Sequence, residues 1–263
     1  VHHAQYQELA EALSEGKVSV GDAEEALLAM KNPYDTIALQ AAGIGYRADY
    51  AYHNGKYYVY FGIVPVLLLY LPYYLLTGGA LQNYVAVFVF FAGFIIAAAG
   101  FVYELMKRYF KEQPFYLWAV GTGMLVGSYS MFYLLIRPDL YHVPIAASTM
   151  FATGGLWLYL AGLNRPKKAV GLYAFGSFCM ALTAGCRPQF ILFAALAVVL
   201  FWERVFVKRE LFSKKGWRQT AALVVPYVLI AAGLMAYNAL RFGSPFDFGA
   251  SYSMTSNDMT HRG

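Results

Sequence analysis

The chain carries its reactive side chains in a few short groups beside long apolar blocks. The first group, residues 47–58, reads Arg-Ala-Asp-Tyr-Ala-Tyr-His-Asn-Gly-Lys-Tyr-Tyr. It places two cations, one histidine and the carboxylate of Asp49 ahead of an apolar segment, and Lys56 suits a phosphate or sugar ligand. Lysine and tyrosine are also common anchors at a membrane interface. Residues 47–58 are therefore either a binding site or an interfacial anchor.

A second polar group, residues 137–142, lies in a short loop between two apolar blocks. It contains Asp139, Tyr141 and His142. Polar side chains at the edge of a bilayer are costly unless they are paired or used. This loop is a candidate sugar or metal site, and a solvated connection is the alternative.

Two arginines stand alone at the ends of apolar blocks. Arg187 lies in the turn at 186–189, where its planar guanidinium would clamp phosphate oxygens or extend to the interface. Arg241 ends the last apolar block and precedes an aromatic loop with one carboxylate, residues 242–249. That loop is either a substrate-gripping loop or a belt of interfacial aromatic residues.

Familiar catalytic signatures do not occur in the sequence. No P-loop, HExxH, GxSxG or dinucleotide-binding fingerprint is present. His2 and His3 are weak evidence for a metal site, because adjacent side chains do not share a helix face.

The composition predicts a membrane protein. Apolar residues make up 59% of the chain and charged residues 13%, against about 25% charged in a typical soluble domain. The net charge is +5, but many of the cations lie in three stretches between apolar blocks, at 107–111, 165–168 and 204–218. This is the positive-inside pattern of cytoplasmic loops, and it argues against a nucleic-acid partner.

The apolar blocks predict an all-α, polytopic transmembrane helix bundle. Blocks of about 20 residues match the thickness of a bilayer. Six spans are expected, at 82–105, 115–136, 143–163, 169–185, 189–206 and 219–240. Since the basic stretches follow the first, third and fifth spans, all three stretches lie on the cytoplasmic side, and the loops at 137–142 and 186–188 lie on the opposite side.

Residues 1–56 differ from the rest and predict an extracytoplasmic loop with amphipathic helices. Apolar residues at helical spacing indicate a helix over 4–15 that ends at Gly16, and Asp22 with Glu25 suggests a capping box for a second helix. The uncharged segment that follows, 57–80, contains two prolines and many interfacial tyrosines. We expect an interfacial or re-entrant hairpin there; a spanning helix would instead place residues 1–56 in the cytoplasm.

The order of these motifs resembles a known enzyme family. The quoted stretches are "DYAYHNGKYYVYFG", "CRPQ" at a helix turn and "YNALRFGSPFDFG". They resemble the GT-C class of membrane glycosyltransferases, including the bacterial lipid A aminoarabinose transferase and the protein O-mannosyltransferases. The resemblance implies a bacterial inner-membrane enzyme that takes a sugar from a polyprenyl-phosphate carrier and is active on the extracytoplasmic face.

The resemblance also implies roles for individual residues. Lys56 and Arg187 would meet the carrier phosphate, and Asp139 would match an acidic residue of the second outer loop. The family's catalytic acidic pair would fall on His2 and His3, so His3 stands where a carboxylate is expected, unless the register differs.

Taken together, the sequence predicts an inverting glycosyltransferase with an envelope glycan, lipid or protein as acceptor. The expected catalytic residues are Asp139, Asp49 and His3. The expected substrate-binding residues are Lys56, Tyr57, Tyr141, His142, Arg187 and Arg241. The cofactor is left open, with a divalent metal as one option. The domains would be 1–56, the hairpin 57–80, a six-helix bundle over 81–240, and the start of an outer loop at 241–263. A transporter or flippase of a lipid-linked precursor and a non-catalytic membrane scaffold are the alternatives.

Overall fold

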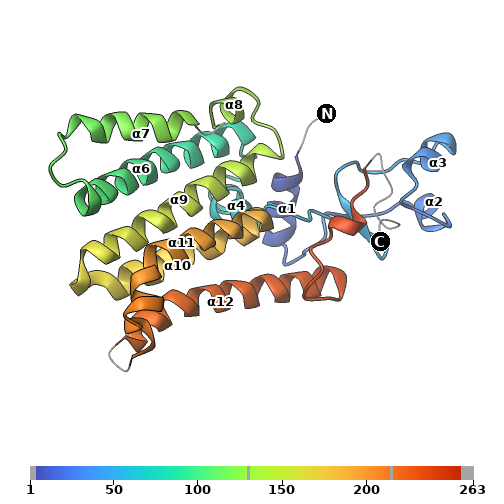
Figure 1. Ribbon diagram of the computed structural model, residues 1–263. Helices are drawn as coiled ribbons and strands as arrows, with labels where there is room; N and C mark the ends of the chain where they lie inside the picture. The colour runs from blue at the N-terminus through green and yellow to red at the C-terminus, as the bar shows by residue number, and fades with distance from the viewer. Residues whose placement is uncertain (1–3, 129–130, 214–215, 256–263) are drawn as a thin grey trace. The chain divides into compact units, whose positions relative to one another are not determined.

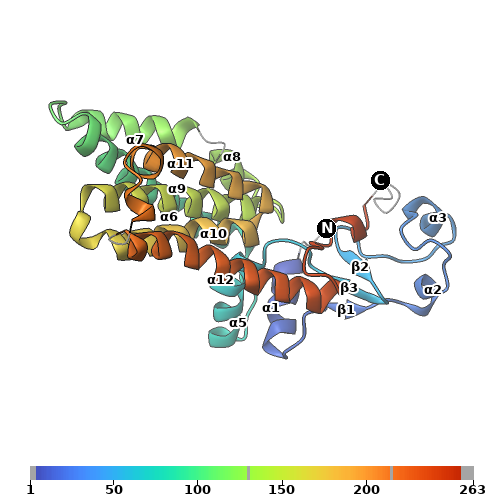
Figure 2. The same ribbon diagram turned by 60° about the horizontal axis from the view of Figure 1, so that its bottom comes forward.

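The computed structural model describes residues 4–128, 131–213 and 216–255. The chain divides into two compact units. The terminal unit combines Val1–Leu81 with Gly233–Gly263, and the helical unit is Gln82–Ala232. Figures 1 and 2 label the elements of both units. The sequence placed 1–56, 57–80 and 241–263 in separate domains, whereas the structure groups these segments in one unit.

The helical unit consists of long apolar helices joined by short connections. Its α-helices are α6 (Asn83–Tyr109), α7 (Tyr116–Ser128), α8 (Met131–Ile136), α9 (His142–Asn164), α10 (Ala169–Cys186), α11 (Ala194–Trp202) and the first part of α12 (Trp217–Phe242). Shorter turns are η2 (Pro166–Lys168), η3 (Pro188–Phe193), η4 (Glu203–Val207) and η5 (Glu210–Phe212).

Five helical segments are long and apolar enough to cross a membrane. They are Asn83–Tyr109, His142–Asn164, Pro166–Cys186, Pro188–Val207 and Trp217–Phe242. These segments agree with five of the six predicted spans and are compatible with a membrane protein. The remaining predicted span, 115–136, contains residues 129–130, which lie outside the described residues; α7 and α8 flank that gap.

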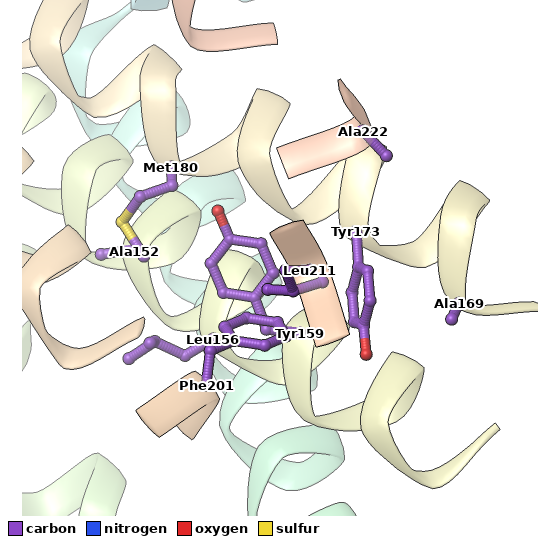
Figure 3. Close-up of a cluster of buried hydrophobic side chains, with 9 residues drawn as sticks. All are labelled: Ala152, Leu156, Tyr159, Ala169, Tyr173, Met180, Phe201, Leu211 and Ala222. Carbon is purple, nitrogen blue, oxygen red and sulfur yellow. The ribbon is translucent and has the colours of Figure 1, made fainter. Parts of the chain in front are cut away.

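Helix α9 packs closely against α6 and α10, as Figure 1 shows. Small residues allow the approach to α10: a Cβ built on Gly155 would lie 3.0 Å from the carbonyl oxygen of Gly176. The nearby core is a cluster of buried side chains around two tyrosines and a phenylalanine (Figure 3). The Phe201 ring meets Tyr159 at 5.5 Å and Tyr173 at 5.0 Å between ring centroids. Such edge-to-face aromatic contacts help to fix the helices in register.

The terminal unit contains helices and a small antiparallel sheet. Its helices are α1 (Gln5–Ser14), α2 (Glu25–Leu28), α3 (Thr36–Ala41), α4 (Ile63–Pro65), η1 (Val66–Tyr70), α5 (Leu71–Thr77) and η6 (Ala250–Tyr252). Its strands are β1 (Gly21–Asp22), β2 (Ala51–His53) and β3 (Lys56–Tyr58), in the order β1-β3-β2.

The prediction of a largely helical chain is confirmed, but the sheet was not foreseen. The β2–β3 hairpin turns at Asn54 and Gly55, whose φ angles of 49° and 79° fit the left-handed conformation that such a tight turn needs. Helix α1 agrees with the predicted helix over 4–15. The predicted capping box is wrong, because Asp22 belongs to β1 and α2 has no side-chain cap.

Residues 57–80 do not form the predicted hairpin. Residues 56–58 are β3, and Ile63–Thr77 is one continuous helical segment through α4, η1 and α5. Pro65 lies in the first turn, where no backbone N–H is needed, and the π-turn η1 precedes Pro72 and accommodates its missing donor. The segment is about 22 Å long at roughly 1.5 Å per residue, shorter than the hydrocarbon core of about 30 Å.

Candidate functional site

Asp49 lies beside a cavity of the terminal unit. The cavity has a volume of about 480 Å³, and its polar wall combines Asp49 with Thr36, Gln40 and Tyr46. The rest of the wall includes Met254 and Thr255, which follow Asp49 by more than 200 positions in the sequence. A carboxylate, an amide, a phenol and a hydroxyl around one space suit a ligand with several hydroxyl groups. We call this space the Asp49 pocket.

The backbone of Asp49 is held in an unusual conformation. Its φ angle is 63°, in the left-handed region that few residues other than glycine adopt. Its N–H donates to the carbonyl of Met254 at 3.0 Å, and its carbonyl accepts from Gln5 Nε2 at 3.3 Å. These contacts from distant segments fix the backbone of Asp49 beside the pocket.

An ion-pair network supports the same region and was not selected from the sequence. The Arg47 guanidinium bonds to Glu8 and donates to the Tyr50 hydroxyl at 2.9 Å and to the Val20 carbonyl at 3.0 Å. The Tyr50 hydroxyl in turn donates to Glu8 Oε2 at 2.7 Å. Burial raises the pKa of Tyr50, and the bond to Glu8 raises it further. The hydroxyl therefore stays neutral and joins α1 to the segment before β2.

Lys56 lies in a different environment from Asp49. It is exposed, begins β3 and pairs across the strands with Asp22. It lines a separate cavity of about 400 Å³ with four carboxylates, from Glu8, Glu11, Glu15 and Asp22, and with Lys17. Lys56 also lies opposite His53 of β2, whereas Asp49 precedes the other end of that strand. The three residues of β2 therefore separate Asp49 from the end of the hairpin that carries Lys56.

Tyr57 is part of the sheet's buried face. Its side chain is 4% exposed and packs against Tyr50 and Tyr52 at ring distances of 6.2 and 5.8 Å. Burial raises the pKa of Tyr57, against a smaller opposing effect of Arg47. A ring in this position supports the hairpin that displays Lys56.

Arg241 is buried, and its guanidinium hydrogen-bonds to other groups of the protein. It is 4% exposed and donates to the Val59 carbonyl and to Asn238 Oδ1, both at 2.7 Å. Its guanidinium lies over the Tyr237 ring at 3.9 Å. These contacts join the end of α12 to the strand segment after β3 within the terminal unit, which is a structural role.

In the helical unit, the polar residues of 137–142 mainly bond to one another. Asp139 Oδ1 accepts from the Leu140 N–H at 2.6 Å, and the His142 N–H donates to the Asp139 carbonyl at 3.0 Å. The His142 ring bonds to the Arg137 carbonyl and packs against Tyr133. These bonds shape the turn that opens α9.

Arg187 and Tyr141 come together from two loops that are distant in sequence. The Arg187 guanidinium lies 5.8 Å from the Tyr141 ring centroid, within the range of a cation–π contact. The loops at 137–142 and 186–188 therefore lie at one end of the helical unit. The basic stretches meet elsewhere: Arg108 of α6 contacts Asn164, at the end of α9, at 3.4 Å.

Two further expectations concern residues and ligands that the structure does not place. His3 lies outside the described residues. Within residues 4–128, 131–213 and 216–255, no group of three or more His, Cys, Asp or Glu side chains is arranged to hold a metal ion.

The chain was compared with known proteins. Neither a protein-family model, nor a curated protein, nor a solved structure matches it. The resemblance to membrane glycosyltransferases therefore depends on the motifs alone.

Proposed function

We propose that the chain transfers a sugar from a polyprenyl-phosphate carrier to a hydroxyl group of an envelope glycan, lipid or protein, on the outer face of a bacterial inner membrane. The observation that carries the proposal is the Asp49 pocket. It places Asp49, whose backbone is held by contacts from distant segments, beside a space lined by groups that bind hydroxyls.

In the proposed reaction, Asp49 is the general base. The acceptor oxygen bonds to the anomeric carbon of the sugar while the bond from that carbon to the phosphate oxygen breaks. Asp49 takes the hydroxyl proton, and polyprenyl phosphate leaves with the bonding electron pair, so the anomeric configuration inverts. A positioned base of this kind contributes about 10²–10⁴-fold to the rate.

The leaving phosphate needs cations to hold its developing charge. Within the terminal unit the candidate is Lys56, because it is exposed on the hairpin that follows Asp49. Arg187 is a candidate through the family resemblance alone. The 137–142 loop, which carries Tyr141, would be held in shape by the bond from the His142 backbone N–H to the Asp139 carbonyl.

The experiment measures transfer from a radiolabelled polyprenyl-phosphate sugar in membranes that contain the full chain. We expect Asp49→Asn to lower the rate by about 10²-fold or more, and Lys56→Gln or Arg187→Gln to lower it through loss of phosphate binding. The matched controls are Glu25→Gln and Lys31→Gln, which remove one charge of each sign in the same unit. Full activity in Asp49→Asn, or in both cation variants, would contradict the proposal.

A non-catalytic scaffold is the second candidate. It is favoured by one observation: Asp49 and Lys56 line separate cavities. A scaffold predicts no transfer by the wild-type chain from any polyprenyl-phosphate sugar, so the same assay separates the two candidates.

A further inference from the structure

A cavity at the basic end of the helical unit carries a strong positive charge. Its volume is about 450 Å³. The wall is made by the last turn of α6, the loop after it and the end of α9. Its residues are Lys107, Arg108, Tyr109, Lys111, Leu163, Asn164 and Pro166. We call it the basic pocket; its wall contains three cations and no carboxylate.

Glu112, beside Lys111, is exposed and offsets one of the three cations, whereas two other nearby carboxylates are already engaged. Glu104, one turn earlier in α6, is 2% exposed and bonds to Arg165 and to Asn164 Nδ2, the latter at 2.9 Å. Glu203, whose charge reaches Arg108, is bridged to Lys208 at 2.8 Å. The partial negative charge at the end of α6 offsets only part of three cations. The pocket therefore keeps a net positive charge.

The guanidinium of Arg108 is held at the pocket wall. Its Nη1 lies 3.4 Å from both the Leu163 carbonyl and Asn164 Oδ1, and its Nε lies 3.3 Å from the Tyr109 hydroxyl. These long contacts orient the group through its Nη1 and Nε donors and leave the two Nη2 N–H groups for a ligand. Guanidinium N–H groups bind phosphate oxygens through charge-assisted hydrogen bonds.

The surface beside the pocket is apolar. Tyr109 is 56% exposed and Phe110 is 52% exposed. Next along the chain, the ring of Phe115 stacks on Trp118 at 5.1 Å, and the indole N–H of Trp118 bonds to the Ala99 carbonyl of α6 at 2.8 Å. A cationic pocket with an aromatic border fits an amphiphile better than a free anion, because the border would contact acyl chains.

We propose that the basic pocket binds the phosphate headgroup of an anionic phospholipid. Lys107, Arg108 and Lys111 hold the phosphate, and Tyr109 and Phe110 contact the glycerol and upper acyl region. Basic pockets at the cytoplasmic ends of membrane helices bind such headgroups. The site depends on the chain being a membrane protein and is independent of the proposed sugar transfer.

The test measures binding of single lipids to the purified full chain in a neutral detergent, by native mass spectrometry. Neutral micelles remove the general attraction of an anionic surface. The variant Lys107→Gln/Arg108→Gln/Lys111→Gln is compared with the control Lys167→Gln/Lys168→Gln/Arg218→Gln. The control removes the same number of cations, all of them exposed and outside the pocket wall. A third variant, Lys107→Arg/Lys111→Arg, keeps the charge and guards against misfolding.

We expect wild type to bind phosphatidylglycerol in preference to phosphatidylcholine. The pocket variant should bind phosphatidylglycerol at least about tenfold more weakly, while the control and the charge-keeping variant bind as wild type does. Equal loss in pocket and control variants would overturn the proposal in favour of general surface charge. Displacement of the lipid by millimolar inorganic phosphate would overturn it in favour of a free anion. No preference between the two lipids would overturn it outright.

Discussion

At the scale of single residues, chemical type alone did not separate ligand-binding groups from structural ones. Arg187 and Arg241 both stand alone at the end of an apolar block, and both were candidate substrate-binding residues. Arg241 is 4% exposed, and it donates to the Val59 carbonyl and to Asn238 Oδ1, each at 2.7 Å. Arg187 instead lies at a loop beside a tyrosine ring. The difference arises from Val59, a partner 182 positions away, which sequence spacing does not reveal.

Replacement of Arg241 by methionine should destabilise the terminal unit. The change leaves the Val59 carbonyl and Asn238 Oδ1 buried without their donor, which costs about 1–3 kcal/mol. Part of that loss is offset, because the Arg241 Nε is itself buried without a partner among the described residues. Thermal unfolding of the purified chain measures the effect, with the exposed Arg218→Met as control.

A second variant separates stability from substrate binding at this position. Arg241→Lys keeps the charge but lacks the planar fork that reaches two acceptors at once, so it should also lower stability. If both Arg241 variants unfold at the wild-type temperature and yet lose sugar transfer, then Arg241 binds substrate and the structural role is wrong.

At the scale of elements, the sequence predicted those segments whose pattern is local. The long helices α6, α9, α10 and α12 follow from continuous apolar blocks, and α1 follows from its helical spacing. The sheet was missed because its strands have only two or three residues, and because β1 meets β3 through pairs such as Gly21 with Tyr57. The Asp49 pocket was also missed, because Met254 and Thr255, which complete its wall, lie at the other end of the sequence.

Close packing of α9 on α10 makes a prediction at this scale. Alanine at Gly155 would bring a Cβ to 3.0 Å from a backbone oxygen and 3.2 Å from Met180, and alanine at Gly176 would meet the Tyr159 ring at 2.8 Å. The helices must separate slightly, so each variant should lower the free energy of unfolding by about 1–3 kcal/mol.

The matched control is Gly171→Ala, also in α10, where a Cβ meets nothing within 4 Å. Alanine favours a helix over glycine by about 1 kcal/mol, so this variant should be neutral or stabilising. Denaturant titration of the three variants measures the difference. Equal stability of Gly155→Ala and Gly171→Ala would show that the helices do not depend on close approach at this crossing.

At the scale of the whole molecule, the polar groups of the helical unit separate to two ends. Glu104, Arg108, Asn164 and Arg165 form one group, through contacts between α6 and the end of α9. Tyr141 and Arg187 form another. This division agrees with the alternation of basic and non-basic loops in the sequence. If the long helices cross a membrane, the positive-inside rule predicts that the basic pocket faces the cytoplasm.

The side of the membrane that residues 1–56 occupy decides whether the proposed reaction is possible. Ile63–Thr77 is about 22 Å long, too short to cross about 30 Å of hydrocarbon without thinning it. We therefore expect residues 1–56 on the same side as the 137–142 loop. Labelling of single cysteines measures which side of the membrane each segment occupies. Cys179 and Cys186 are first replaced by alanine. The exposed positions are then changed one at a time, as Glu25→Cys, Ile136→Cys and Lys168→Cys.

A membrane-impermeant maleimide applied to intact spheroplasts should label Glu25→Cys and Ile136→Cys at once, and Lys168→Cys only after permeabilisation. Labelling of Glu25→Cys together with Lys168→Cys would mean that 63–77 crosses the bilayer. In that case Asp49 and Lys56 lie in the cytoplasm, opposite Arg187, and no outer-face transfer by these residues is possible. Labelling of Ile136→Cys together with Lys168→Cys would instead contradict the orientation of the spans while leaving the basic pocket intact.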